Sequence, residues 1–146
     1  MAYQHILVPI DGSETAYTAL TQAAALAKAF NAKVTVVQVL TLDPYIAAEY
    51  ITAQQTNELI ERARRSIEGH LQDAQTKFAE LGIDVTTQLL EGQSISLEIA
   101  KSAKKLNADV IVIGSHGRTG IKKLLLGSVA QSVLSEADLP VLIVKG

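Results

Sequence analysis

The stretch Val110-Ile111-Val112-Ile113-Gly114 decides the fold, because four consecutive β-branched residues run directly into a glycine. A run that is apolar at every position is typical of a strand buried on both faces, as in a parallel sheet. The residues before it keep the 3.6-residue spacing of a helix with one apolar face: Ile95, Ile99, Ala100, Ala103 and Leu106. The stretch therefore predicts a buried strand that follows a helix.

The same alternation of strand and helix extends over the whole chain. Short apolar runs predict five strands: His5–Ile10, Lys33–Leu40, Asp84–Leu90, Asp109–Ile113 and Val141–Val144. Helical patterns cover residues 16–30 and 60–81, and a less regular one covers roughly Leu125 to Glu136. Such alternation predicts an α/β fold, an open parallel sheet with helices on both faces. In the order 3-2-1-4-5, the ends of the first and fourth strands would flank the ligand crevice.

Composition narrows the function classes. The chain has 146 residues, which suits one domain, and 48% of them are hydrophobic. A net charge of −2, with no basic stripe and only 4% aromatic residues, argues against a nucleic-acid partner. The absence of cysteine excludes disulfides and thiolate metal sites. No apolar run is long enough to cross a membrane, and the N-terminus has no signal sequence, so we expect a soluble, cytoplasmic protein.

The most unusual local chemistry follows the fourth strand. Gly114 and Gly117 allow a tight turn and a close approach of the backbone to a ligand. Gly127-Ser128 opens the next helix, where free N–H groups and the helix dipole favour a phosphate. Neither the P-loop pattern nor the dinucleotide fingerprint is present. From these residues alone, a phosphate site and a purely structural turn are equally good interpretations.

Two neighbouring features are also open to more than one interpretation. His116 lies between the two glycines, but without an obvious catalytic partner it is interpreted as a loop residue, not a general base. The segment Thr41–Ala53 has no clear period and is either a lid or a plain surface loop.

The spacing Gly114-x2-Gly117-x9-Gly127-Ser128 matches the G-2x-G-9x-G-[S/T] motif of nucleotide-binding universal stress proteins. The opening Ile6–Ser13 and the closing Leu139–Val144 also resemble that family's first and last strands. On these matches the chain resembles the ATP-binding branch of the universal stress protein family. The resemblance implies a single domain over residues 1–146, with a Rossmann-like fold of the adenine nucleotide alpha hydrolase type.

The resemblance also implies which residues bind a nucleotide. Pro9 and Asp11 would contact the ribose or the metal-phosphate group, although Asp11 is equally placed to cap the first helix. The backbone of Val39 would address the adenine edge. The remaining implied residues would line the ribose and the phosphates: Gly114, Gly117, Gly127, Ser128 and Val129. Mg²⁺ would then be held mainly through the phosphates of ATP, or of ADP, with no dedicated protein metal site.

Three functions remain, of which we favour a regulatory, stress-response protein that binds ATP or AMP. The second is a slow ATPase, and the sequence offers no catalytic residues for a faster one, since a Walker lysine is missing. The third is a dimeric interaction scaffold with a vestigial nucleotide site. For all three, the resemblance implies a homodimer through the last strand, Val141–Val144, which lies at the edge of the predicted sheet.

Overall fold

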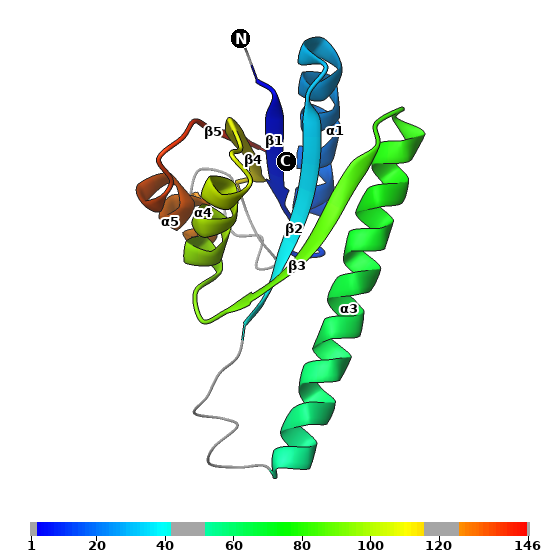
Figure 1. Cartoon of the computed structure of the whole chain (residues 1–146), viewed down its shortest axis with the longest axis vertical. Helices are drawn as coiled ribbons and strands as arrows, with labels where there is room; N and C mark the ends of the chain where they lie inside the picture. The colour runs from blue at the N-terminus through cyan, green and yellow to red at the C-terminus, as the bar shows by residue number, and fades with distance from the viewer. Residues whose placement is uncertain (1–2, 42–51, 116–125, 146) are drawn as a thin grey trace.

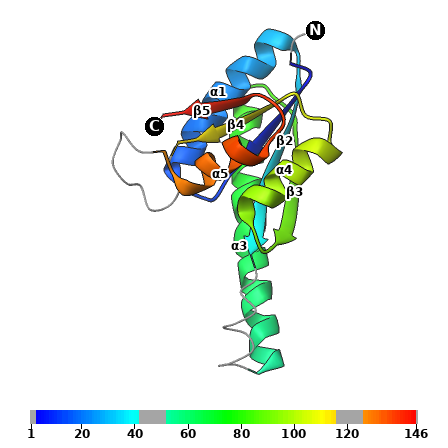
Figure 2. The ribbon, with the colours of Figure 1, turned by 90° about the vertical axis from the view of Figure 1, so that its left-hand side faces the viewer.

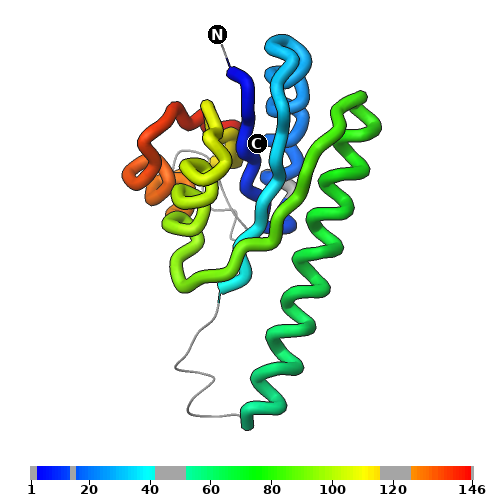
Figure 3. The backbone as a smooth tube through the Cα atoms, viewed as in Figure 1, coloured from blue at the N-terminus to red at the C-terminus, as the bar shows by residue number. Residues whose placement is uncertain are grey.

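The computed structural model describes residues 3–41, 52–115 and 126–145 (Figure 1). Five strands form one parallel sheet: β1 (His5–Pro9), β2 (Lys33–Thr41), β3 (Val85–Gly92), β4 (Val110–Gly114) and β5 (Val141–Val144). Their order is β3-β2-β1-β4-β5, which confirms the predicted 3-2-1-4-5. Figure 3 traces the connection from β1 to β2 and that from β3 to β4, each of which returns the chain to the amino end of the next strand. The central strands β1, β2 and β4 are almost wholly buried.

Two helices cover each face of the sheet (Figures 1 and 2). Helices α1 (Glu14–Phe30) and α3 (Ala53–Glu80) pack on one face, where Ile6 and Val8 meet Phe78 in the larger core. Helices α4 (Ile95–Lys105) and α5 (Ser128–Glu136) pack on the other face, where Leu7 lies in a smaller core. Because successive side chains of a strand point to opposite faces, β1 contributes to both cores.

The helix ends follow from local side-chain chemistry. Ser13 caps α1 by accepting a hydrogen bond from the N–H of Ala16 at 3.2 Å, so Asp11 is not the cap of the first helix. Ser94 caps α4 by accepting a hydrogen bond from the N–H of Leu97 at 3.3 Å. At α5 the N-cap is Gly127, and the helix begins three residues later than the predicted start at 125. Leu125, the predicted first residue of this helix, lies outside the described part of the chain together with residues 116–124.

Helix α3 is longer than the apolar pattern indicates. It begins at Ala53, where Thr52 and Gln55 form a reciprocal capping box, and Gly82 follows its end with a φ of 82°. Its fully buried residues lie in the second half, from Ile67 to Phe78, while the first half projects beyond the sheet (Figure 2). Sequence periodicity misses residues 53–59 because they are mostly exposed and show no apolar stripe, whereas Ile60 and Ala63 pack against the larger core. No helix in the described ranges is long and apolar enough to cross a membrane.

The carboxylate of Asp109 ties β1 to β4 at their amino ends. Its Oδ2 accepts hydrogen bonds from the N–H groups of Gln4 and His5, at 2.5 and 2.9 Å. The N–H of Asp109 in turn donates to the carbonyl of His5 at 2.8 Å. These bonds precede the ladder in which Ile6 lies opposite Val110, so they fix the register of the two strands.

Replacing Asp109 with alanine should lower the free energy of unfolding by about 2 kcal/mol, because two backbone donors lose a charged acceptor. Urea denaturation measures this. Asp109→Asn retains one acceptor oxygen and should lose less. Asp84→Ala, at an exposed position before β3, should stay within about 0.5 kcal/mol of the parent. Equal losses for Asp109→Ala and Asp84→Ala would contradict the role of this carboxylate.

Candidate functional site

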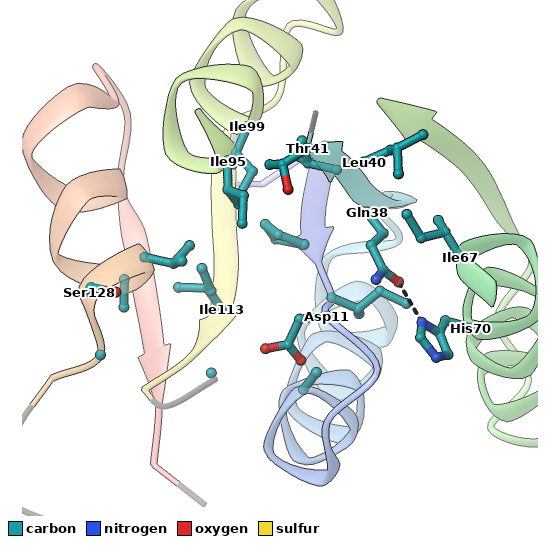
Figure 4. A pocket seen from close by; sticks show the side chains of 18 of the residues that line it. Asp11, Gln38, Leu40, Thr41, Ile67, His70, Ile95, Ile99, Ile113 and Ser128 are labelled. Atoms are coloured by element: carbon teal, nitrogen blue, oxygen red, sulfur yellow. Dashed lines mark hydrogen bonds between the residues drawn. The ribbon is translucent and has the colours of Figure 1, made fainter. Parts of the chain in front are cut away.

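A cavity of about 580 Å³ lies over the carboxyl ends of the central strands (Figure 4). It runs from α3 on one side, across the ends of β2, β1 and β4, to the start of α5 on the other. Its volume is within the range of small-molecule sites. Its position is the one that a parallel sheet of this order predicts, beside the reversal between β1 and β4.

The cavity brings together seven of the eight residues predicted to bind a ligand. These lining residues are Pro9, Asp11, Val39, Gly114, Gly127, Ser128 and Val129. The eighth, Gly117, lies outside the described residues, as does His116 beside it. The same holds for residues 42–51, most of the segment predicted to be a lid or a surface loop.

The start of α5 forms the polar end of the cavity. The N–H of Gly127 donates to the carbonyl of Ser115 at 2.6 Å, which holds the beginning of the helix against the end of β4. Gly127 has no side chain to cap the helix, so Ser128, Val129 and Ala130 begin it without a side-chain partner for their N–H groups. Because the positive end of the helix dipole lies here, this end of the cavity favours an anion.

Asp11 points into the middle of the cavity from the turn between β1 and α1 (Figure 4). Its Oδ1 accepts a hydrogen bond from the N–H of Ser13 at 2.9 Å. This local bond fixes the side chain in a half-buried position at the end of a buried strand. Asp11 is the one carboxylate among the described residues that line the cavity, so a cation and its anionic ligand would meet here.

The opposite end of the cavity contains a polar pair that the sequence analysis missed. His70 of α3 donates from Nδ1 to Oε1 of Gln38 on β2, at 3.0 Å (Figure 4). Gln38 is only 7% exposed. A signal existed for both residues: Gln38 interrupts an apolar strand, and His70 falls on the buried stripe of α3 between Ile67 and Leu71.

The wall between these polar ends is apolar. Val39, Ile95, Ile99 and Ile113 line it from the α4 side, and Ile67 lines it from α3. Such walls accept a flat, uncharged ring, while the polar ends orient it. Among the described residues, no group of three or more His, Cys, Asp or Glu side chains is placed to hold a metal ion. The cavity thus combines an apolar slot with an anion-favouring end.

Comparisons with known proteins agree with this geometry. The model of the universal stress protein family matches residues 2–145. Universal stress protein MJ0531 of Methanocaldococcus jannaschii is 36% identical over 144 residues, which are 98% of this chain and 82% of that protein. The structure of protein MJ0577 superposes with a TM-score of 0.85 at 31% identity, covering 100% of this chain and 98% of that one.

Two further solved structures are similar and contain ligands. A universal stress protein in complex with cAMP has a TM-score of 0.71 at 26% identity, covering 99% of this chain and 98% of that one. The universal stress protein of Archaeoglobus fulgidus in complex with dAMP has a TM-score of 0.68, also at 26% identity, covering 99% and 100%. With the family model matched over nearly its whole length, this chain belongs to the universal stress protein family.

Proposed function

We propose that this protein binds an adenine nucleotide, ATP or its products ADP and AMP, and acts as a regulatory binding module in a stress response. The observation that carries the proposal is the cavity in which the uncapped start of α5, Asp11 and the end of β2 face one another. The complexes of related proteins with cAMP and dAMP support the ligand class.

In this proposal the phosphates lie at the start of α5, where Gly127, Ser128 and Val129 offer backbone N–H groups and one hydroxyl. The ribose lies near Gly114 and Asp11. The base lies in the apolar slot at the end of β2, beside Val39. The spacing from Gly114 through Gly117 to Gly127 further supports the ATP-binding branch of the family.

Mg²⁺ fits this arrangement as an ion held mainly by phosphate oxygens. Magnesium ions that accompany nucleotides use only one or two protein carboxylates, and Asp11 is a carboxylate in the right place. The ion would neutralise phosphate charge near Asp11. Asp11 itself would orient the metal-phosphate group or the ribose.

Binding without rapid turnover is the version of the function that the lining residues favour. Transfer of a phosphoryl group needs cationic groups that stabilise its developing charge. Among the described lining residues there is no lysine or arginine. A slow ATPase is therefore the second candidate, and a cytoplasmic location suits either one.

Native mass spectrometry of the purified protein tests the proposal. After the protein is stripped and mixed with ATP and Mg²⁺, we expect up to one ATP for each subunit. A slow shift of the bound mass to ADP would favour the ATPase. A protein that takes up no nucleotide would contradict the proposal and leave the glycine segment a structural turn.

Ser128→Ala should weaken ATP binding about fivefold, which corresponds to the loss of one hydrogen bond of about 1 kcal/mol. Isothermal titration calorimetry measures the affinity. Ser135→Ala is the matched control, since that hydroxyl lies further along α5 and donates to the carbonyl of Gln131 at 3.2 Å. Because Ser128 is the first residue of α5 and not its cap, an unchanged affinity would remove its hydroxyl from the site.

We further propose a homodimer in which β5 (Val141–Val144), an edge strand, pairs with its copy. Val141 and Ile143 pack against the smaller core, so a charge there would disturb the fold itself. Leu142 is 41% exposed on the same strand and is the better position to test.

Leu142→Lys should convert the dimer into monomers, because two edge strands that both carry a lysine repel one another. Sedimentation velocity measures the change. Leu59→Lys, on the projecting half of α3 with Leu59 49% exposed, serves as a control for an added surface charge. If Leu142→Lys sediments as the parent dimer does, the interface is elsewhere.

A further inference from the structure

The amide nitrogen of Gln38 donates no hydrogen bond to any residue that the structure describes. Gln38 is 93% buried, since its exposed fraction is 7%. Its Oε1 accepts from His70, but no group in the described part of the chain accepts from its Nε2. Figure 4 shows the nitrogen on the side of the amide that faces the cavity. An amide N–H that faces a cavity and has no described protein acceptor is available to a ligand, so its presence in the cavity wall points to one.

His70 determines which way that amide faces. The carboxamide presents an acceptor at one end and a donor at the other. The Nδ1–H of His70 donates to Oε1 of Gln38 at 3.0 Å, so the amide nitrogen is turned toward the cavity. Removing His70 would free the amide to rotate and would leave its oxygen without this partner.

The imidazole ring of His70 lies directly against the backbone at Gly12. A Cβ built at Gly12 would lie 2.5 Å from Cε1 of His70 and 2.8 Å from each ring nitrogen. Gly12 also has a φ of 83°, which L side chains rarely adopt. The ring therefore occupies the space that a side chain at position 12 would need, directly beside Asp11.

The surroundings of Gln38 select the part of a nucleotide that it would meet. The cavity lining near it is apolar, through Val39, Leu40 and Ile67. The anion-favouring start of α5 lies at the other end, with the carboxylate of Asp11 between (Figure 4). A phosphate beside Gln38 would meet no lysine or arginine among the described lining residues and would be close to the carboxylate of Asp11. A neutral aromatic ring with an in-plane nitrogen acceptor fits both the apolar walls and a single N–H donor.

We propose that Gln38 recognises the purine base of the bound nucleotide, with its Nε2–H donating to a ring nitrogen, and that His70 is the positioning residue that aims it. This inference rests on the proposed nucleotide binding and adds the contact that selects the base. It predicts that the affinity for a purine nucleotide depends on one particular ring nitrogen of the base.

Calorimetric titration with AMP and with its 1-deaza, 3-deaza and 7-deaza analogues tests the contact. Each analogue replaces one ring nitrogen by carbon and so removes one acceptor. We expect the parent protein to bind one of the three about five- to tenfold more weakly than AMP. Gln38→Leu and the longer Gln38→Met should bind AMP as weakly as the parent binds that analogue. Neither variant should distinguish the analogue from AMP.

The role of His70 is tested in the same titrations. His70→Leu should lose most of the discrimination between AMP and the chosen analogue. His70→Asn, which keeps a side-chain N–H donor near the position of Nδ1, should restore much of it. In the Gln38→Leu background, the His70→Leu change should have no further effect. A merely structural role for His70 would weaken all ligands alike and would not be rescued by asparagine.

The possible outcomes distinguish a failure of the proposed base contact from a failure of the proposed nucleotide binding. If the parent protein binds AMP and all three analogues equally, the proposed base contact is wrong, while the proposed nucleotide binding is supported. The parent protein alone is sufficient for this test. If Gln38→Leu folds but weakens all ligands by the same factor, the contact is to the sugar or is indirect, and the inference is again wrong. If the parent binds no adenine nucleotide, both proposals fail.

Discussion

The cavity lies where the described helices that come after β1 and after β4 pack on opposite faces of the sheet. The connection after β1 enters α1 on the face of the larger core, and α5, the next helix after β4, lies on the other face. Right-handed crossovers require this divergence wherever the strand order reverses. The hydrogen bonds of Asp109 fix the register of the same two strands from their amino ends. The position of every lining residue therefore depends on one neighbour relation, β1 beside β4.

The strand order and the strand bounds were predicted well from the sequence, because both depend on residues buried in the core. Buried strands such as β4 must be apolar at nearly every position, so their bounds could be predicted to within a residue or two. The turn Asp11–Ser13, and the contact of Gly127 with Ser115 at the end of β4, follow once the strand order is known. The side-chain hydrogen bonds that cap α1 and α3 were not predicted. Helix capping was an alternative role for Asp11 until the structure gave that role to Ser13, and the capping box at Thr52 lies far from any apolar stripe.

Gln38 and His70 illustrate the limit of pattern analysis in more detail. Both residues occupy positions that periodicity assigns to the core: one in a strand of apolar residues, the other between Ile67 and Leu71. A single sequence shows that each is polar, but their proximity depends on how α3 packs against β2. The glycine at position 12 belongs to the same arrangement, since only the structure reveals that the imidazole fills the space beside it. Buried polar residues in predicted core positions are thus the signal to examine first.

The two ends of the cavity impose different chemistry on a ligand that spans them. At the α5 end, helix N–H groups stabilise negative charge without supplying a mobile proton. At the β2 end, an oriented amide and apolar walls suit a neutral ring. Between them Asp11 would disfavour an anionic group that is not accompanied by a cation. A ligand that spans the cavity would therefore need negative charge at one end and a neutral ring at the other. The nucleotide proposed above meets both requirements, since its phosphates carry the negative charge and its base is a neutral ring.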